Sequence, residues 1–324
     1  MSKSVNILTD PYYSDLPQLV LDFLTYHLNA RNHSAASVHG YACDLRTLYR
    51  VLAIRHGLAH KDAPLASIDV SALPDTFIRE ATLEDLYAFQ SFSQGDALSP
   101  ATRSRRSSCV KSYFHWLVSK RRILDTDVSF DLDMPKLPAQ LPRFLEEDDC
   151  RKLLSVCTGG DKVRDRAILL VFLSCGLRVS ELVGLNVKDL HGDHMTVRGK
   201  GGKERVVYFG QSCRDALDAW LTQRASVEIV PEDRDALFIS RNRRRICARA
   251  VTNVVKSSLE AAGLDSEHIS CHKLRHTAAT LMLKNGVDTR VLKEVLGHSS
   301  LNTTQIYTHV TSASLRAAAM ANPI

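Results

Sequence analysis

The chain has 324 residues, of which 42 are Lys or Arg and 36 are Asp or Glu, for a formal net charge of +6. Its length favours two domains, and its hydrophobic fraction of 44% is ordinary for a protein with a buried core. No apolar run is long enough to cross a bilayer, and residues 1–14 predict a loose leader instead of a signal peptide. We therefore expect a soluble, cytoplasmic protein.

The excess of positive charge lies in the second part of the chain. Residues 1–140 hold 15 basic and 15 acidic side chains, whereas residues 141–324 hold 27 and 21. A basic domain suits a polyanion such as nucleic acid, because binding releases condensed counterions. The eight cysteines form no CxxC pair, so they predict neither a zinc site nor a disulfide framework and are expected to be reduced and mostly buried.

Apolar periodicity predicts a helical first domain, with helices over 15–28, 34–52, 81–92 and 99–120. The last helix is basic in its first half, with Arg103, Arg105 and Arg106. These arginines could contact phosphates or could simply form a solvated helix end. The segment MPKLPAQLP then holds three prolines in nine residues, which predicts an extended linker and a domain boundary.

The second domain is predicted to be mainly helical, with a small β-hairpin. The two alternating runs of MTVRGKGGKERVVYF, residues 195–209, are separated by glycines and predict a hairpin with Lys200 and Lys203 at its basic tip. Gly286 and Gly297 stand at helix ends, where a left-handed residue is favoured. The helices expected here cover residues 146–156, 161–173, 211–224, 248–262, 272–285, 289–296 and 300–308.

Several residues of this domain suit phosphate chemistry. Arg178 stands at a predicted helix start, where it could be an ordinary surface arginine or could face an anion beside backbone N–H groups. His272 and Arg275 are three residues apart and share a helix face. His276 would complete half of a metal site with His272, but Lys273 stands where zinc hydrolases of that type place a glutamate.

Three further side chains complete the set. Lys200 lies on the predicted hairpin, His298 follows the glycine predicted to end a helix, and Tyr307 lies on a predicted short amphipathic helix, where a tyrosine alone is more often a packing residue. Together these groups make a cationic pocket with one oxygen nucleophile and several proton carriers. Such a pocket stabilises a pentavalent phosphorane without a metal. No acidic cluster suited to magnesium is evident, so no metal or cofactor is predicted.

Taken in chain order, these residues resemble the catalytic set of the tyrosine recombinase (phage integrase) family. That set runs Arg, Lys, His-x-x-Arg, His or Trp, and Tyr. The matching positions are Arg178 in GLRVSELVGL, Lys200 in GKGGKERVV, His272 and Arg275 in HKLRHTAAT, His298 in LGHSS and Tyr307 in TQIYTHV. The resemblance is close over about residues 145–310 and less specific over the linker and the first domain. Within the family, the two-domain size is most similar to Xer-type recombinases.

The resemblance implies the domain organisation and the partner. It implies a helical core-binding domain over 1–133, a Pro-rich linker over 134–144 and a mixed α/β catalytic domain over 145–324. The expected partner is a double-stranded DNA recombination site in the nucleoid. A tetramer would assemble on synapsed DNA, with itself or with a second related recombinase, and the tail 312–324 would dock on a neighbouring protomer.

The resemblance also implies the chemistry. Tyr307 would attack the scissile phosphate, leaving a 3′-phosphotyrosine and a free 5′-hydroxyl without ATP. Arg178 and Arg275 would hold the nonbridging oxygens, supported by His298. The strands would rejoin through a Holliday junction, in chromosome dimer resolution or in the integration and excision of a mobile element.

Proton transfer is assigned by the same resemblance. Lys200 would protonate the leaving 5′-oxygen, and His272 would take the tyrosine proton. Lys203 and the three arginines of the first domain would contact phosphate, and Glu181 would orient its neighbours. The alternatives are a type IB topoisomerase-like nicking enzyme, which would not form Holliday junctions, and a non-catalytic DNA-binding protein, which would not form an adduct.

Overall fold

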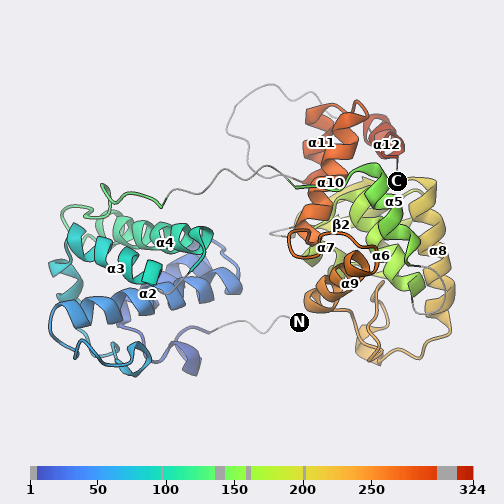
Figure 1. Ribbon diagram of the computed structural model, residues 1–324. Helices are drawn as coiled ribbons and strands as arrows, with labels where there is room; N and C mark the ends of the chain where they lie inside the picture. The colour runs from blue at the N-terminus through green and yellow to red at the C-terminus, as the bar shows by residue number, and fades with distance from the viewer. Residues whose placement is uncertain are drawn as a thin grey trace. The chain divides into compact units, whose positions relative to one another are not determined.

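The computed structural model describes residues 6–95, 98–135, 143–157, 162–199, 202–297 and 312–323. The chain divides into two compact units, Met1–Gln140 and Leu141–Ile324, and each is considered by itself (Figure 1). Among these residues, no helix combines the length and apolarity that a membrane span requires.

The first unit confirms the four helices expected from periodicity. Ser34 Oγ accepts the backbone N–H of Ser37 at 3.2 Å, and Ser99 Oγ accepts that of Thr102 at 3.2 Å, so both predicted N-caps are present. Pro100 fills the first position of the last helix. Helix α2 packs against the other three. The helices are α1 (Gln18–Thr25), α2 (Ala35–Arg55), α3 (Leu83–Gly95) and α4 (Pro100–Ser119).

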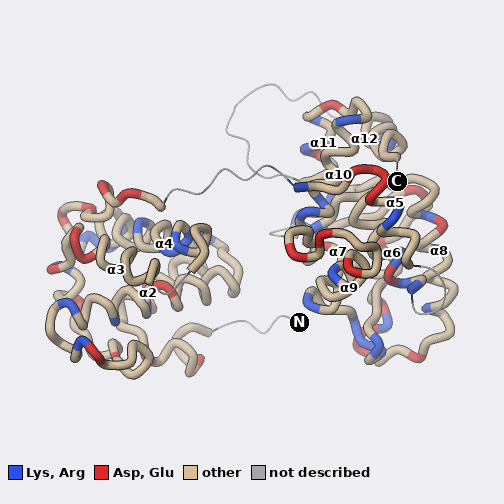
Figure 2. The backbone as a smooth tube through the Cα atoms, viewed as in Figure 1, with Lys and Arg blue, Asp and Glu red and all other residues tan. Residues whose placement is uncertain are grey.

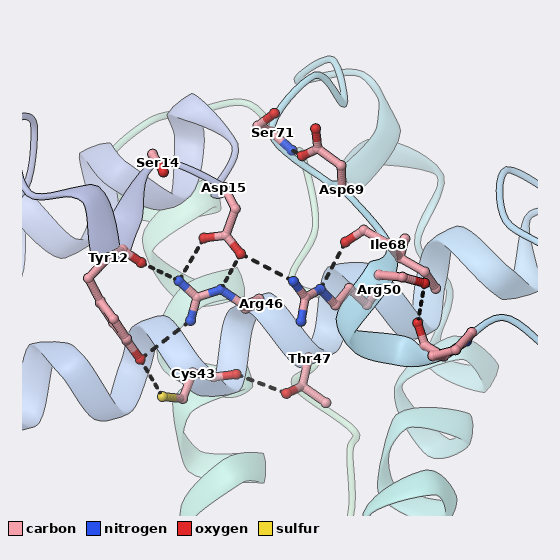
Figure 3. Close-up of polar contacts among 12 residues, drawn as sticks. Tyr12, Ser14, Asp15, Cys43, Arg46, Thr47, Arg50, Ile68, Asp69 and Ser71 are labelled. Carbon is pink, nitrogen blue, oxygen red and sulfur yellow. Dashed lines mark hydrogen bonds and ion pairs between the residues drawn. The ribbon is translucent and has the colours of Figure 1, made fainter.

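The prediction of a loose leader is wrong for residues 7–14. Tyr13 is only 2% exposed, and Arg46 on α2 fixes the segment by donating to both Asp15 carboxylate oxygens at 2.7 Å and to the Tyr12 carbonyl at 2.7 Å (Figure 3). Arg50, one turn further along α2, donates to Asp15 at 3.2 Å and to the Ile68 carbonyl at 2.9 Å. The short polar leader is therefore held by partners more than thirty residues away.

His27 is a buried histidine in the first unit. It lies in a π-helical turn, Tyr26–Ala30, that extends α1, and it is 6% exposed. Its ring centre is 4.3 Å from that of Phe23, and its Nδ1 is 3.3 Å from Nδ1 of His33. Burial, with smaller contributions from the positive charges of His33 and Arg31, lowers the pKa of His27 to about 4. The imidazole is therefore neutral in the folded protein at pH 7.

We expect this histidine to make the first unit sensitive to acid. Because its folded pKa lies below its unfolded value, the unfolded chain binds the extra proton, and stability is lost as pH falls from 6.5 towards 4. Between pH 7 and 4.5 the loss should be about 2–3 kcal/mol. Hydrogen exchange of the α2 and α4 peptides in rising urea measures it. His27→Gln should abolish this part of the pH dependence, whereas His60→Gln, at a 75% exposed position, should not. An unchanged slope in His27→Gln would contradict the assignment.

The second unit surrounds the central helix α6, in which every residue from 167 to 175 is buried. Helices α8 and α10 both pack on α6. The predicted helices before residue 297 are confirmed, whereas the one expected at 300–308 lies outside the described residues. The helices are α5 (Glu147–Ser155), α6 (Lys162–Cys175), α7 (Val179–Gly184), α8 (Gln211–Ala225), α9 (Ala248–Ala261), α10 (Cys271–Lys284), α11 (Thr289–Leu296) and α12 (Ser312–Met320).

The predicted hairpin forms two strands of an antiparallel three-stranded sheet. β2 (His194–Arg198) pairs with β3 (Glu204–Tyr208), with Val197 opposite Arg205. A third strand, β1 (Leu190–His191), pairs with β2 and was not predicted. The Gly199 N–H donates to the Lys203 carbonyl at 2.8 Å and closes the hairpin. The fold is therefore mainly α with a small sheet, as the sequence predicts.

Candidate active site

Arg178 is the N-cap of α7, at the helix start that the sequence predicts. Its backbone N–H donates to Glu181 Oε2 at 2.9 Å and its Nη1 to Glu181 Oε1 at 2.9 Å. Its Nη2 reaches the Gly297 carbonyl at 3.3 Å, and the side chain is 40% exposed. The guanidinium is thus fixed from one side and open to solvent from the other.

Arg275 lies on α10 and is 4% exposed. Its Nη1 donates to the Gly176 carbonyl and its Nη2 to the Leu296 carbonyl, both at 2.6 Å. Burial, followed by the positive charge of Arg178, lowers the pKa of Arg275 to about 10, so the group still carries its charge at neutral pH. Arg275 therefore joins the loop before Arg178 to the end of α11.

Gly176 allows the loop before Arg178 to lie close to the end of α11. Its φ is +61°, and a Cβ placed there would lie 2.7 Å from Leu296 Cδ2. Gly297, which ends α11, has φ +65° and a left-handed conformation, as predicted. Its carbonyl accepts from Arg178, so the chain leaves α11 beside that arginine. His298, the next predicted site residue, lies outside the described residues.

Glu181 is the shared partner of the arginines, and its side chain is 3% exposed. Arg205 on β3 binds both carboxylate oxygens, each at 2.9 Å, and Arg275 Nη1 lies 3.8 Å from Oε2. Burial would raise the pKa of Glu181, but the hydrogen bonds from Arg205 and from the Arg178 N–H outweigh it and lower the pKa. The carboxylate is therefore ionised, and the orienting role expected for Glu181 stays a prediction.

Arg205 was not predicted as a site residue from the sequence, although the alternation of the strand indicates that it lies on a buried face. Met195, Val197 and Val207 are buried, and residue 205 lies on the same face of the sheet as they do. An arginine on a buried face needs an ionic partner. The sequence does not say where that partner lies, because Glu181 is 24 residues earlier in the chain.

His272 and His276 form a close pair on α10. Their Nε2 atoms are 3.1 Å apart. Burial, followed by the positive charges of Arg275, Lys273 and Arg178, lowers the pKa of His272 and favours the neutral imidazole. Within the described ranges, no group of three His, Cys, Asp or Glu residues is arranged to hold a metal ion.

The structure thus brings together three of the six predicted catalytic residues, Arg178, His272 and Arg275. Lys200, His298 and Tyr307 lie outside the described residues. Lys203 follows the undescribed part of the hairpin tip and is exposed. The roles predicted for all of these residues remain predictions.

Two of the three predicted DNA-contacting arginines of the first unit, Arg105 and Arg106, have side-chain partners within that unit. Arg105 donates to Asp44 Oδ2 at 2.5 Å and to Oδ1 at 2.8 Å, and Arg106 Nη1 to Ser93 Oγ at 3.1 Å. Asp44 is 1% exposed, whereas the Arg105 side chain is 49% exposed. Arg105 therefore neutralises a buried carboxylate, and the predicted phosphate contacts of Arg103, Arg105 and Arg106 stay predictions.

Replacing Arg105 with glutamine should destabilise the first unit. The buried Asp44 would lose its bidentate partner, which costs about 2–3 kcal/mol after allowance for the half-exposed arginine. Hydrogen exchange of α2 and α4 in rising urea reports the change, with Arg103→Gln as the control on the same helix. Combining Arg105→Gln with Asp44→Asn should recover part of the loss. Equal stability of Arg105→Gln and Arg103→Gln would contradict a structural role for this pair.

A basic loop before α9 was also not singled out from the sequence. Figure 2 shows blue residues gathered in the loop that leads into α9. Arg245 fixes it by donating to the Val183 and Leu185 carbonyls, both at 3.0 Å. The exposed members are Arg241, Arg243, Arg244 and, at the start of α9, Arg249. The run RNRRR at 241–245 was visible in the sequence, but charge alone does not show that one of its arginines is structural.

The C-terminal helix α12 packs on its own unit. Ala318 joins a buried cluster with residues of α10 and α11, and Arg316 binds Asp193 Oδ2 at 2.6 Å. Asn322 Nδ2 donates to the Leu173 carbonyl at 2.9 Å. Docking of the tail on a neighbouring protomer would require these contacts to be exchanged, and it stays a prediction.

Comparisons with known proteins show the family of the chain. The model of the phage integrase family matches residues 143–314. Tyrosine recombinase XerC of Caldanaerobacter subterraneus subsp. tengcongensis is 39% identical over 310 residues, which cover 95% of this chain and 87% of that protein. Tyrosine recombinase XerC of Corynebacterium efficiens is 37% identical over 311 residues, which cover 94% of this chain and 91% of that protein.

Solved structures show the same fold. XerH site-specific recombinase bound to difH substrate, in a pre-cleavage complex, has a TM-score of 0.63 at 22% identity, over 97% of this chain and 91% of that one. A lambda integrase dimer bound to a COC′ core site has a TM-score of 0.63 at 17% identity, over 93% of this chain and 80% of that one. The chain belongs to the phage integrase family and is a tyrosine-type site-specific recombinase.

Proposed function

We propose that the chain cleaves and rejoins two DNA strands at a specific site through a 3′-phosphotyrosine on Tyr307 and a Holliday junction. The observation that carries this proposal is the pair of arginines, Arg178 and Arg275, which both lie beside Glu181. Backbone carbonyls also fix them, that of Gly297 for Arg178 and those of Gly176 and Leu296 for Arg275. Two guanidinium groups are suited to the nonbridging oxygens of one phosphate. His272, on the same helix as Arg275, supplies a neutral imidazole.

In the proposed reaction, Tyr307 Oη bonds to phosphorus while the bond from phosphorus to the 5′-oxygen breaks. The tyrosine proton goes to His272, and Lys200 protonates the leaving 5′-oxygen. Arg178 and Arg275 offset the charge that builds on the nonbridging oxygens, and His298 adds a further hydrogen bond. A 5′-hydroxyl of the partner strand then attacks phosphorus and gives its proton back to Lys200, while the bond from phosphorus to Tyr307 Oη breaks and His272 returns the tyrosine proton. The reaction therefore needs neither a metal nor ATP.

The proposed assembly is a tetramer on two synapsed double-stranded DNA sites, formed with itself or with a second related recombinase. Residues 1–133 would form the core-binding domain, joined by the linker 134–144 to the catalytic domain 145–324. Arg103, Arg105, Arg106 and Lys203 would contact phosphate, and the exposed arginines before α9 would add to this basic surface. The recombinase would act in the cytoplasm, in chromosome dimer resolution or in the movement of an integrative element.

Covalent trapping tests the proposal. The protein is incubated with randomly nicked genomic DNA of the organism that encodes it, denatured, and recovered with any DNA that remains attached. We expect attached DNA with wild type, and its sequence should converge on one site. Two copies of that site on one plasmid should then yield Holliday junctions. DNA binding without attached DNA would overturn the proposal in favour of a non-catalytic DNA-binding protein, and attachment with supercoil relaxation but no junctions would favour a type IB topoisomerase-like enzyme.

A further inference from the structure

Arg205 joins three parts of the second unit that are distant in sequence. Its Nη1 and Nη2 bind the two carboxylate oxygens of Glu181 on α7, each at 2.9 Å. Its Nε donates to the Val295 carbonyl in the last turn of α11 at 3.1 Å. The side chain is 16% exposed, so these contacts are made largely out of water. All three guanidinium nitrogens of Arg205 therefore donate to Glu181 or to the end of α11.

The chain around Arg205 is shaped to hold it. A Cβ on Gly297 would lie 3.1 Å from three atoms of the Arg205 guanidinium group, so this glycine is needed for the contact as well as for its φ of +65°. Val197, opposite Arg205 in the sheet, is fully buried. The strand that carries Arg205 begins at Glu204, four residues after Lys200 in the sequence. The position of Arg205 is therefore fixed from three sides.

The charges indicate what the contact does. Glu181 is one buried carboxylate near three guanidinium groups, and Arg205 takes both of its oxygens in the bidentate geometry that Arg and carboxylate favour. Arg178 then shares only Oε1 through its side chain, and Arg275 stays 3.8 Å from Oε2. Without Arg205, the carboxylate would be free to pair with Arg178 and Arg275 directly. Pairing of that kind would neutralise the two charges that the proposed reaction needs for phosphate.

We propose that Arg205 is a positioning residue that occupies Glu181 and so keeps Arg178 and Arg275 available to the scissile phosphate. This inference rests on the proposed function for the role of the two arginines. Arg205 itself would not touch DNA. It would act through Glu181 and through the end of α11.

The test compares single and double substitutions in the full chain, with the rate of covalent attachment to nicked genomic DNA as the readout. Arg205→Gln should slow attachment by about 10²-fold, the scale of losing one charge-stabilising donor. Arg205→Lys should retain part of the activity, because lysine keeps the charge but not the bidentate geometry. The matched control is Arg198→Gln on the same hairpin, whose partner Glu204 is 52% exposed. This control should change the rate less than about threefold.

The decisive variant combines Arg205→Gln with Glu181→Gln. It removes the competing carboxylate together with its partner, so attachment should be at least about tenfold faster than with Arg205→Gln alone. A merely structural contact predicts the opposite, because a second substitution in a buried network would lower activity further. A double variant no faster than Arg205→Gln, or an Arg205→Gln rate equal to that of Arg198→Gln, would overturn the inference.

Hydrogen exchange without DNA separates this inference from the proposed function. Arg205→Gln should alter exchange in peptides covering 176–182 and 293–297, and Arg198→Gln should leave both unchanged. If wild type forms no adduct, the proposed function fails. Unchanged exchange in Arg205→Gln would overturn the positioning role even where wild type forms its adduct. Thermal unfolding of each variant identifies any protein that has simply lost its fold, in which case Arg205→Lys serves in its place.

Discussion

Glutamine in place of Arg275 is expected to slow covalent attachment to nicked genomic DNA by about 10³-fold, at the upper end for loss of one oxyanion donor. The loss is large because the residue has two tasks. It would hold the phosphate, and it also joins the Gly176 and Leu296 carbonyls at 2.6 Å each. Two buried carbonyls left without a donor cost about 1–3 kcal/mol each, so unfolding should occur at lower urea.

Two comparisons test this account of Arg275. Arg275→Lys should remain strongly impaired, because an ammonium cannot reach both carbonyls and a phosphate in the planar geometry of arginine. Arg290→Gln, at an exposed position on α11, is the matched control and should behave as wild type. Attachment by Arg275→Gln at the rate of the Arg290 variant would contradict the role given to Arg275.

Glu181→Gln is the second substitution with a large expected effect. It would leave three guanidinium groups without the carboxylate that they surround, and breaking a buried ion pair in this way costs about 3–5 kcal/mol. We also expect covalent attachment to slow by about 10²-fold, because the charge of Arg205, left without its carboxylate partner, repels Arg178 and Arg275 and displaces them from the phosphate. Urea unfolding followed by hydrogen exchange of the α7 and α10 peptides measures the stability of this region.

The pH dependence gives a further check on Glu181. Its pKa in the folded protein is lowered, so its stabilisation is present above the ordinary pKa of 4.5 and is lost as pH falls through the lowered value. Glu181→Gln should lack this acid-dependent part. Glu204→Gln, which removes a 52% exposed carboxylate from the same unit, is the control. Equal acid sensitivity of wild type and Glu181→Gln would show that the carboxylate is not the ionised centre of the network.

Local sequence signals predicted most of the fold. Ser34 and Ser99-Pro100 marked two helix starts because capping is decided within one turn. The glycines between two alternating runs marked the hairpin, because a turn is also decided by residues that are neighbours in sequence. β1 was missed because two residues, Leu190–His191, are too few to show alternation. The leader was misjudged because Arg46 and Arg50 lie on a helix far along the chain.

The site residues that local motifs mark were predicted, whereas those that depend on distant partners were not. Arg178, His272 and Arg275 were predicted from their motifs, and the structure places them in one unit around α7 and α10. Arg205 was missed because its role depends on Glu181 and Val295, which are 24 and 90 residues away. The ion pair between Arg105 and Asp44 was not predicted, because the two residues are 61 positions apart. Pairing between distant charged residues is a tertiary property, and alternation or capping does not report it.

Mass spectrometry of the covalent adduct tests the central claim most directly. The adduct formed on nicked genomic DNA would be digested with nuclease and protease, and the peptide that carries residual nucleotide would be sequenced. We predict that nucleotide is attached to Tyr307 through a 3′-phosphate and that Tyr307→Phe yields no adduct. Nucleotide on another residue, or an adduct that persists in Tyr307→Phe, would contradict the assignment of the nucleophile.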